Sequence, residues 1–208
     1  MTTLLVLNSS ASGEASVSRL LVEEAVAKLL ARDPQASVIR RDLGADPVPH
    51  LTADAIVGIR GEPASEAQRA TRALSDALVE ELKAADIVVI GAPMYNFGIA
   101  STLKAWFDHV LRAGVTFRYT EAGPQGLLKG KRAIVVESRG GLYSEGPAKP
   151  WDSQEPHLRT LLGFMGIGDV AFVRAEKLGF GPEAREQAIA GAKTELARVA
   201  EAPLPLAA

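Results

Sequence analysis

Three stretches of this sequence carry residues of the kind that bind a flat, negatively charged ligand. The first, residues 8–18, is rich in serine hydroxyl groups and leads into a predicted helix. Unpaired main-chain amides at a helix N-terminus attract anions, so this stretch predicts a phosphate site. Ser16 or Ser18 suits the ordinary role of a helix cap equally well, and both interpretations stay open.

The second stretch, residues 92–107, begins where an apolar run, residues 87–90, ends. Turn-forming residues stop the predicted strand there, and aromatic and thioether side chains offer contacts to a flat ring. These residues are Gly91, Pro93, Met94, Tyr95, Asn96 and Phe97. A loop that only packs its own aromatic side chains is the alternative interpretation.

The third stretch, residues 138–143, reads Ser138-Arg139-Gly140-Gly141-Leu142-Tyr143. Two consecutive glycines let a backbone approach a ligand closely and point its amides at the polar edge of a ring. An ordinary strand-ending turn would use the same residues. Taken together, the three stretches fit a mononucleotide whose phosphate meets the first loop and whose ring lies between the other two.

Short β-branched runs alternate with helical patterns along the chain, and this alternation is typical of a parallel sheet. We predict strands at residues 3–7, 37–41, 87–91, 132–137 and 169–173. An apolar stripe at helical spacing lies between the first two, at Leu21, Val22, Ala25, Val26 and Leu29. Two long connections, residues 44–63 and 114–130, show no plain helical pattern.

This order of elements predicts an α/β fold of the flavodoxin-like class. We expect a doubly wound, five-stranded parallel sheet with helices on both faces, a three-layer αβα arrangement, in a single domain over residues 1–208. Ligands of such sheets bind outside the carboxyl ends of the strands. The ends of the first, third and fourth predicted strands are where the three unusual stretches lie.

Composition excludes several classes of function. With 208 residues, 47% of them hydrophobic, the chain can bury a sizeable core. The net charge is −2 and the sequence has no block of Lys or Arg, so it indicates no basic surface for binding nucleic acid or an anionic membrane. The absence of Cys excludes thiolate catalysis and is compatible with the cytosol. We find no signal peptide or membrane span, and expect a cytoplasmic protein.

Motifs of better-known nucleotide sites and hydrolases are missing. The loop after the first strand contains neither G-x-G-x-x-G nor G-x-x-x-x-G-K-[ST], so a Rossmann dehydrogenase and a P-loop ATPase are not expected. No G-x-S-x-G elbow offers a serine nucleophile. His50, His109 and His157 lack the spacing of metal ligands, and we expect no metal site.

Longer motifs, in the same order along nearly the whole chain, match those of a known family. They are residues 5–10, 92–97, 112–121, 129–131, 138–141 and 161–166. In these the chain closely resembles the FMN-dependent NADH azoreductases, also called NADH:quinone oxidoreductases. The resemblance implies one FMN per subunit, NADH as the electron donor, and a homodimer in which each flavin site lies near the interface and is finished by the partner chain.

The resemblance also implies roles for individual residues. The phosphate would be held by Ser10, Ser16, Val17 and Ser18. The isoalloxazine and ribityl chain would be lined by Met94, Tyr95, Asn96 and Phe97, and the polar edge of the ring by Ser138, Arg139, Gly140 and Gly141. Candidates for the substrate pocket are Arg60, Tyr119, Tyr143 and Phe164, although Phe164 suits core or interface packing equally well.

The activity implied is a two-step reduction. NADH would pass a hydride to the flavin, and a quinone or azo compound would then enter the same pocket and be reduced, which is ping-pong kinetics. The chain departs from the family at Tyr143, where some members carry His, and at Gly98 and Ala122, where Asn is common. These departures bear on substrate preference. Use of NADPH would need an arginine near its 2′-phosphate, for which Arg60 and Arg139 are candidates.

Two alternatives from other classes remain. A flavodoxin-like electron carrier would bind FMN without turning over a small substrate, but such carriers are commonly smaller and more acidic. An interaction domain of the same shape would bind no flavin, and would leave the coincidence of three unusual loops at one edge without explanation.

Overall fold

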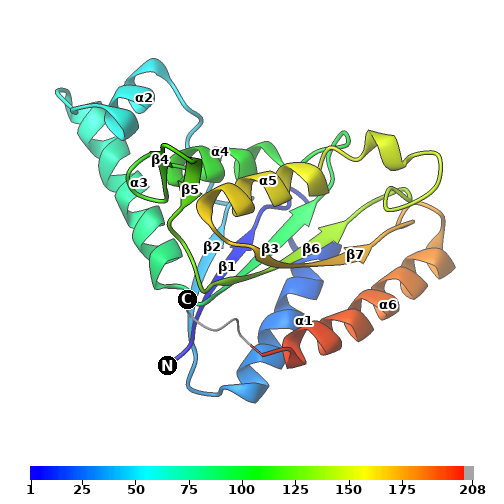
Figure 1. Ribbon diagram of the computed structural model, residues 1–208. Coiled ribbons are helices and arrows are strands. Elements are labelled where there is room, and N and C mark those ends of the chain that lie inside the picture. The colour runs from blue at the N-terminus through cyan, green and yellow to red at the C-terminus, as the bar shows by residue number, and fades with distance from the viewer. Residues whose placement is uncertain (204–208) are drawn as a thin grey trace.

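The computed structural model describes residues 1–203, and a parallel sheet runs through its centre (Figure 1). Its five strands lie in the spatial order β2-β1-β3-β6-β7, and all neighbours pair in parallel. They are β1 (Thr3–Asn8), β2 (Ser37–Asp42), β3 (Ile87–Pro93), β6 (Arg132–Ser138) and β7 (Asp169–Ala175). The order confirms the expected fold class. Residues 204–208 of the predicted domain lie outside the described residues.

Each strand begins at the predicted residue and continues one or two residues beyond the predicted end. Most of the extra residues are polar, and the others are proline or alanine, so the run of large apolar side chains ends before the strand pairing does. Asn8 still pairs with Asp42 on one side and Gly91 on the other, and Pro93 with Ser138. The central strand β3 is buried along its whole length, as expected of a parallel strand covered on both faces.

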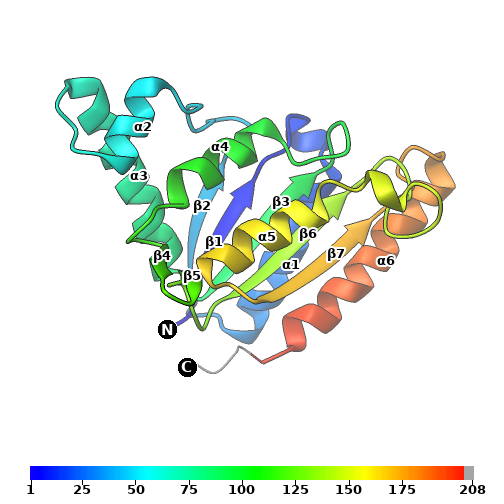
Figure 2. The same cartoon turned by 45° about the horizontal axis from the view of Figure 1, so that its top comes forward.

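Helices cover both faces of the sheet (Figures 1 and 2). On one face α1 (Val17–Arg32) and α6 (Pro182–Glu201) pack on Leu4 and Val6, and the predicted stripe of α1 is buried there. On the other face α3 (Glu66–Ala84), α4 (Ser101–Val110) and α5 (Glu155–Met165) pack on Leu5 and Leu7. The alternation of β1 residues between the two faces follows from the two-residue period of a strand.

The two long connections contain structure of their own. Residues 44–63 include a short helix, α2 (Ala53–Arg60), whose N-terminus is capped by the Thr52 side chain. The expectation that this segment holds no plain helix is therefore wrong for those eight residues. Residues 114–130 include an antiparallel hairpin, β4 (Phe117–Thr120) and β5 (Gly123–Gly126).

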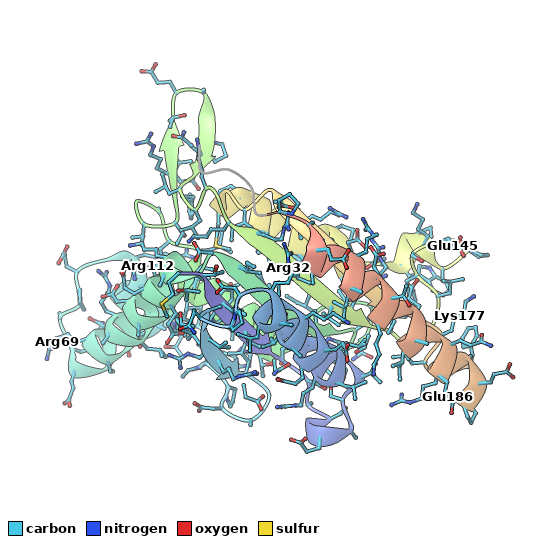
Figure 3. All side chains as sticks on the ribbon, turned by 90° about the horizontal axis from the view of Figure 1, so that it is seen from below. Arg32, Arg69, Arg112, Glu145, Lys177 and Glu186 are labelled. Carbon is cyan, nitrogen blue, oxygen red and sulfur yellow. The ribbon has the colours of Figure 1, made fainter. Side chains whose placement is uncertain are left out.

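The β4–β5 hairpin stands out from the body of the molecule (Figure 3). Its base is fixed, because Gly126 lies so close to the end of α5 that a Cβ atom there would be 2.1 Å from the nitrogen of Gly166. Beyond Phe117 the residues of β4 are exposed. Two 3₁₀ turns, η1 (Gly13–Ala15) and η2 (Lys149–Trp151), complete the elements. Within residues 1–203, no helix has the length and apolar character needed to cross a bilayer.

Candidate functional site

The loops that follow β1, β3 and β6 meet at the carboxyl edge of the sheet, because these three strands are neighbours. Hydrogen bonds join the loops directly. The Ser9 hydroxyl donates to the carbonyl oxygen of Gly91 at 2.7 Å, and the Met94 amide donates to the carbonyl oxygen of Ser138 at 2.9 Å. The three stretches singled out in the sequence therefore lie together at one edge of the sheet.

A small hollow of about 180 Å³ lies between these loops. Its lining is polar on the side of the β1 loop, and six of the predicted cofactor residues contribute to it. The lining residues are Ser10, Ser12, Ala15, Ser16, Val17, Pro93, Met94, Tyr95, Ser138, Leu178 and Arg185. The hollow is suited to a small anion, since hydroxyl groups, an arginine and the positive end of a helix dipole surround it.

The N-terminus of α1 supplies part of this hollow. The Ser16 side chain caps the helix by accepting a hydrogen bond from the Arg19 amide at 3.2 Å. Ser16 thus fills the capping role and also lines the hollow. Since the cap satisfies Arg19, the first-turn amides of Val17 and Ser18 are the ones left for a ligand. The Ser18 hydroxyl is buried at 3.0 Å from that of Ser16 and does not line the hollow.

The hydroxyl group of Tyr95 closes one side of the hollow. Its oxygen accepts a hydrogen bond from the Ala11 amide and lies 3.4 Å from the Ser10 hydroxyl. Burial acts to raise the pKa of Tyr95, but these hydrogen bonds outweigh it and hold the pKa below its usual value. A hydroxyl whose oxygen already accepts a hydrogen bond is a stronger donor through its own hydrogen.

A strained turn directly after Tyr95 exposes an aromatic ring. Tyr95 and Gly98 exchange two main-chain hydrogen bonds, and the residues between them have positive φ: 48° at Asn96 and 71° at Phe97. A non-glycine residue in this region costs on the order of 1 kcal/mol or more, and such strain is concentrated at functional sites. The Phe97 ring is 45% exposed and meets the rings of Tyr143 and Trp151 edge to face.

The two glycines after β6 have different surroundings. A Cβ atom at Gly140 would meet no atom within 4 Å, so this residue borders open space. A Cβ atom at Gly141 would lie 3.0 Å from the ring of Tyr143. The Glu176 carboxylate fixes the end of this loop by accepting hydrogen bonds from the amides of Tyr143 and Ser144, at 2.8 and 3.0 Å.

Arg139 departs from its expected place. Its guanidinium is fully buried and ion-paired with Glu137, Asp152 and Glu176. The side chain is therefore turned into the protein, away from any ligand, and cannot reach the 2′-phosphate of NADPH. Of this residue only the main chain borders the loop, and its amide and carbonyl groups are bonded to Ala175 and Leu178.

The four candidate substrate residues fall into two groups. Arg60 and Tyr119 line a second hollow of about 530 Å³ between α2, α3 and the hairpin, and Phe164 packs against Phe117 in its wall at a ring distance of 4.6 Å. Tyr143 instead lies in the loop after β6, where its ring contacts that of Phe97. The two hollows share no lining residue. In Figure 1, α2 and the hairpin lie to the left, whereas β3 and β6 point to the upper right.

Sequence reasoning missed one residue that lines the first hollow and one aromatic neighbour of Phe97. Arg185 lies in the first turn of α6, and Trp151 at the end of η2 is 60% exposed beside Phe97. Trp151 follows the third loop closely in sequence, whereas Arg185 comes from a distant segment, and only a helix start at Gly181-Pro182 could have drawn attention to it. Among residues 1–203, no group of three or more His, Asp or Glu side chains is arranged to hold a metal.

Comparison with known proteins gives a consistent result. Residues 2–200 match the family described as flavodoxin-like fold. An FMN-dependent NADH:quinone oxidoreductase of Hyphomonas neptunium is 61% identical, with 97% of each chain covered. One of Azotobacter vinelandii is 52% identical, covering 96% of this chain and 100% of its own.

Solved structures agree with these relatives. An azoreductase from Bacillus anthracis superposes with a TM-score of 0.88 at 31% identity, over 96% of this chain and 99% of that one. An FMN-dependent NADH-azoreductase from the same species, in complex with FMN, has a TM-score of 0.85 at 26% identity, over 97% of this chain and 100% of that one. The resemblance inferred from the motifs is confirmed. Because its sheet is flavodoxin-like and its matches cover nearly the full length of both chains, this chain belongs to the FMN-dependent NADH:quinone oxidoreductase family.

Proposed function

We propose that this protein uses FMN to carry a hydride from NADH to quinones and to aromatic azo compounds. The relatives from Hyphomonas neptunium and Azotobacter vinelandii are named for the quinone reaction, and the Bacillus structures for the azo reaction. The observation that carries the proposal is the anion-suited hollow at the N-terminus of α1, because its lining includes Tyr95 and the same loop carries the exposed Phe97 ring, which contacts the half-buried Tyr143.

The residues present fit FMN. The phosphate suits the hollow, where Ser10, Ser16 and the amides of Val17 and Ser18 can donate hydrogen bonds. Residues 94–97 and the open space beside Gly140 would hold the ribityl chain and the ring. The positive charge of Arg185 would offset the negative charge of the phosphate. When bound, FMN supplies a ring that accepts a hydride from one substrate and delivers it to another.

The chain's own residues position this chemistry and stabilise charge. The amides of Gly140 and Gly141 and the side chain of Asn96 would offset negative charge on the ring edge. Phe97 and Tyr143 provide apolar walls for flat substrates. Donor and acceptor use the same pocket in turn, so we expect ping-pong kinetics. We assign no side chain as an obligatory acid.

We further propose that the active form is a homodimer with one FMN per subunit. Arg60 and Tyr119 line a hollow away from the β1, β3 and β6 loops of their own chain. The hairpin that carries Tyr119 projects from the body, and Tyr119 is 72% exposed. In a dimer, a second copy of the chain would bring its Arg60 and Tyr119 to the flavin site of the first copy, which these residues do not reach within their own chain.

We also propose that the chain forms one domain over its full length and that the protein is cytoplasmic.

The proposal is tested by mixing the protein with FMN under anaerobic conditions and adding NADH, then a quinone or an azo dye. We expect bound flavin whose visible absorbance is bleached by NADH and restored by the acceptor. Bound flavin that NADH does not bleach would favour the electron carrier instead. If no flavin binds, the proposed function is wrong.

A further inference from the structure

Arg139 is the centre of a buried polar cluster beneath the β6 loop. Its Nη2 lies 2.8 Å from the Glu137 carboxylate, and its Nη1 lies 3.1 Å from Asp152 and 3.3 Å from Glu176. Its Nε donates to the side-chain oxygen of Gln154 at 2.9 Å. The guanidinium therefore contacts four side chains from three separate segments, and none of its surface is exposed.

Each partner of Arg139 fixes a different part of the candidate site. Glu176 holds the amides of Tyr143 and Ser144, which continue the Gly140-Gly141 loop. Gln154 donates through its Nε2 to the carbonyl oxygen of Ala92 at 2.8 Å, at the end of β3. The cluster thus connects the ends of β3, β6 and β7.

Asp152 extends the cluster toward the aromatic rings. Its Oδ1 accepts hydrogen bonds from the amides of Gln154 and Glu155 at the start of α5, while its Oδ2 faces Arg139. The neighbouring Ser153 amide donates to the carbonyl oxygen of Phe97 at 3.0 Å, at the strained turn. The position of Phe97 is therefore coupled to the segment that Asp152 holds.

A single guanidinium is suited to this task in a way that other cations are not. Its five N–H groups form a rigid, planar fork that can bind several acceptors at fixed angles, whereas a lysine ammonium is a point charge on a flexible stem. Three carboxylates around one buried cation would repel one another without it. Removing the fork therefore releases several loops at once.

From this juxtaposition we propose that Arg139 is a positioning residue: through Glu176, Asp152 and Gln154 it sets the relative placement of the loops that contact the FMN ring. The inference rests on the proposed function. It assigns Arg139 no contact with the ligand, and it predicts that weakening the cluster impairs recognition of the ring while leaving recognition of the phosphate intact.

The test compares Arg139→Lys with Arg132→Lys by titrating each protein with FMN and with riboflavin, which lacks the phosphate. Arg132 is the first residue of β6, where it pairs with Asp169, and Arg139 directly follows the last residue of that strand. Each variant therefore loses one largely buried arginine fork at one end of β6. We expect Arg139→Lys to raise the Kd for both flavins by about tenfold, the equivalent of one or two hydrogen bonds to the ring. Arg132→Lys is expected to leave both values within twofold of the wild type.

The visible circular dichroism of bound flavin provides a second readout, since it reports the surroundings of the ring. Arg139→Lys should change this spectrum, whereas loss of thermal stability alone should not. Unchanged flavin affinity and spectrum in Arg139→Lys would overturn the inference. If that variant does not fold, Glu176→Gln replaces it in the test. We expect Glu176→Gln to raise the Kd for both flavins severalfold, and unchanged Kd values would overturn the inference. A wild type that binds no FMN would overturn the proposed function itself, and this inference with it.

Discussion

The hydroxyl oxygen of Tyr95 lies 3.0 Å from the main-chain nitrogen of Ala11, so one hydrogen bond joins the loop after β3 to the loop after β1. The two residues are far apart in sequence, and they meet because β1 and β3 are neighbours in the sheet. This contact shapes the wall of the hollow to which we assign the FMN phosphate.

Replacement of Tyr95 by Phe removes this hydrogen bond and keeps the ring. Because a single hydrogen bond contributes about 1 kcal/mol, we expect the Kd for FMN to rise about fivefold. Fluorescence titration of the apoprotein measures this directly. An affinity equal to that of the wild type would show that the Tyr95 hydroxyl does not shape the site.

The double variant Ser16→Ala with Ser18→Ala tests the phosphate assignment. We expect the Kd for FMN to rise about tenfold and that for riboflavin to stay unchanged, since only FMN carries the phosphate. Loss of the Ser16 cap should also lower the free energy of unfolding by about 1 kcal/mol. Ser65→Ala is the matched control, because Ser65 caps α3 in the same way outside the site. It should lose stability without losing FMN affinity.

Arg185→Gln tests the positive charge that the sequence did not reveal. We expect weaker FMN binding at low salt, unchanged riboflavin binding, and a smaller difference at high salt, because an exposed charge is screened by ions. Arg198→Gln removes an exposed arginine from the same helix, where it pairs with Glu195, and serves as the control. If both variants bind FMN with equal affinity at every salt concentration, Arg185 does not contribute to FMN binding.

Glu137 makes the stability of the apoprotein depend on pH. Burial raises its pKa to about 7, against the opposing effect of Arg139; Glu155 also raises it, and Arg174 lowers it. A carboxyl group whose pKa is raised by folding stabilises the folded state fully below its unfolded pKa, near 4.5, and this contribution is lost as pH rises through 7. Arg139 is shared with Asp152 and Glu176, so the cluster carries excess negative charge at high pH.

Glu137→Gln should remove this pH dependence. Denaturant unfolding of both proteins between pH 5 and pH 8 measures it. We expect the free energy of unfolding of the variant, relative to the wild type, to increase with pH by up to about 3 kcal/mol, which is the shift from 4.5 to 7 in energy terms. A difference between the two proteins that stays constant with pH would contradict a raised pKa at Glu137.

Local features of the chain were sufficient to predict its framework. The β-branched runs of β1, β2, β3, β6 and β7 and the apolar stripe of α1 repeat with the periods of a strand and a helix, so the predicted starts of all five strands are correct. The same holds for the three loops, because parallel strands bring their carboxyl ends to one edge. Helix α2 has only eight residues, and its short pattern did not stand out from the surrounding loop.

Only the tertiary structure shows which charged side chains near the loops are buried in the protein and which line the hollow. Arg139 sits in a motif that resembles a ligand-binding loop, yet its side chain is buried, because Asp152, between η2 and α5, and Glu176, directly after β7, neutralise it. Arg185 reaches the hollow only because α6 packs beside α1. Sequence patterns report periodicity within a segment. Which charged groups meet depends on contacts between segments far apart in the chain, and those are set when the whole fold closes around its core.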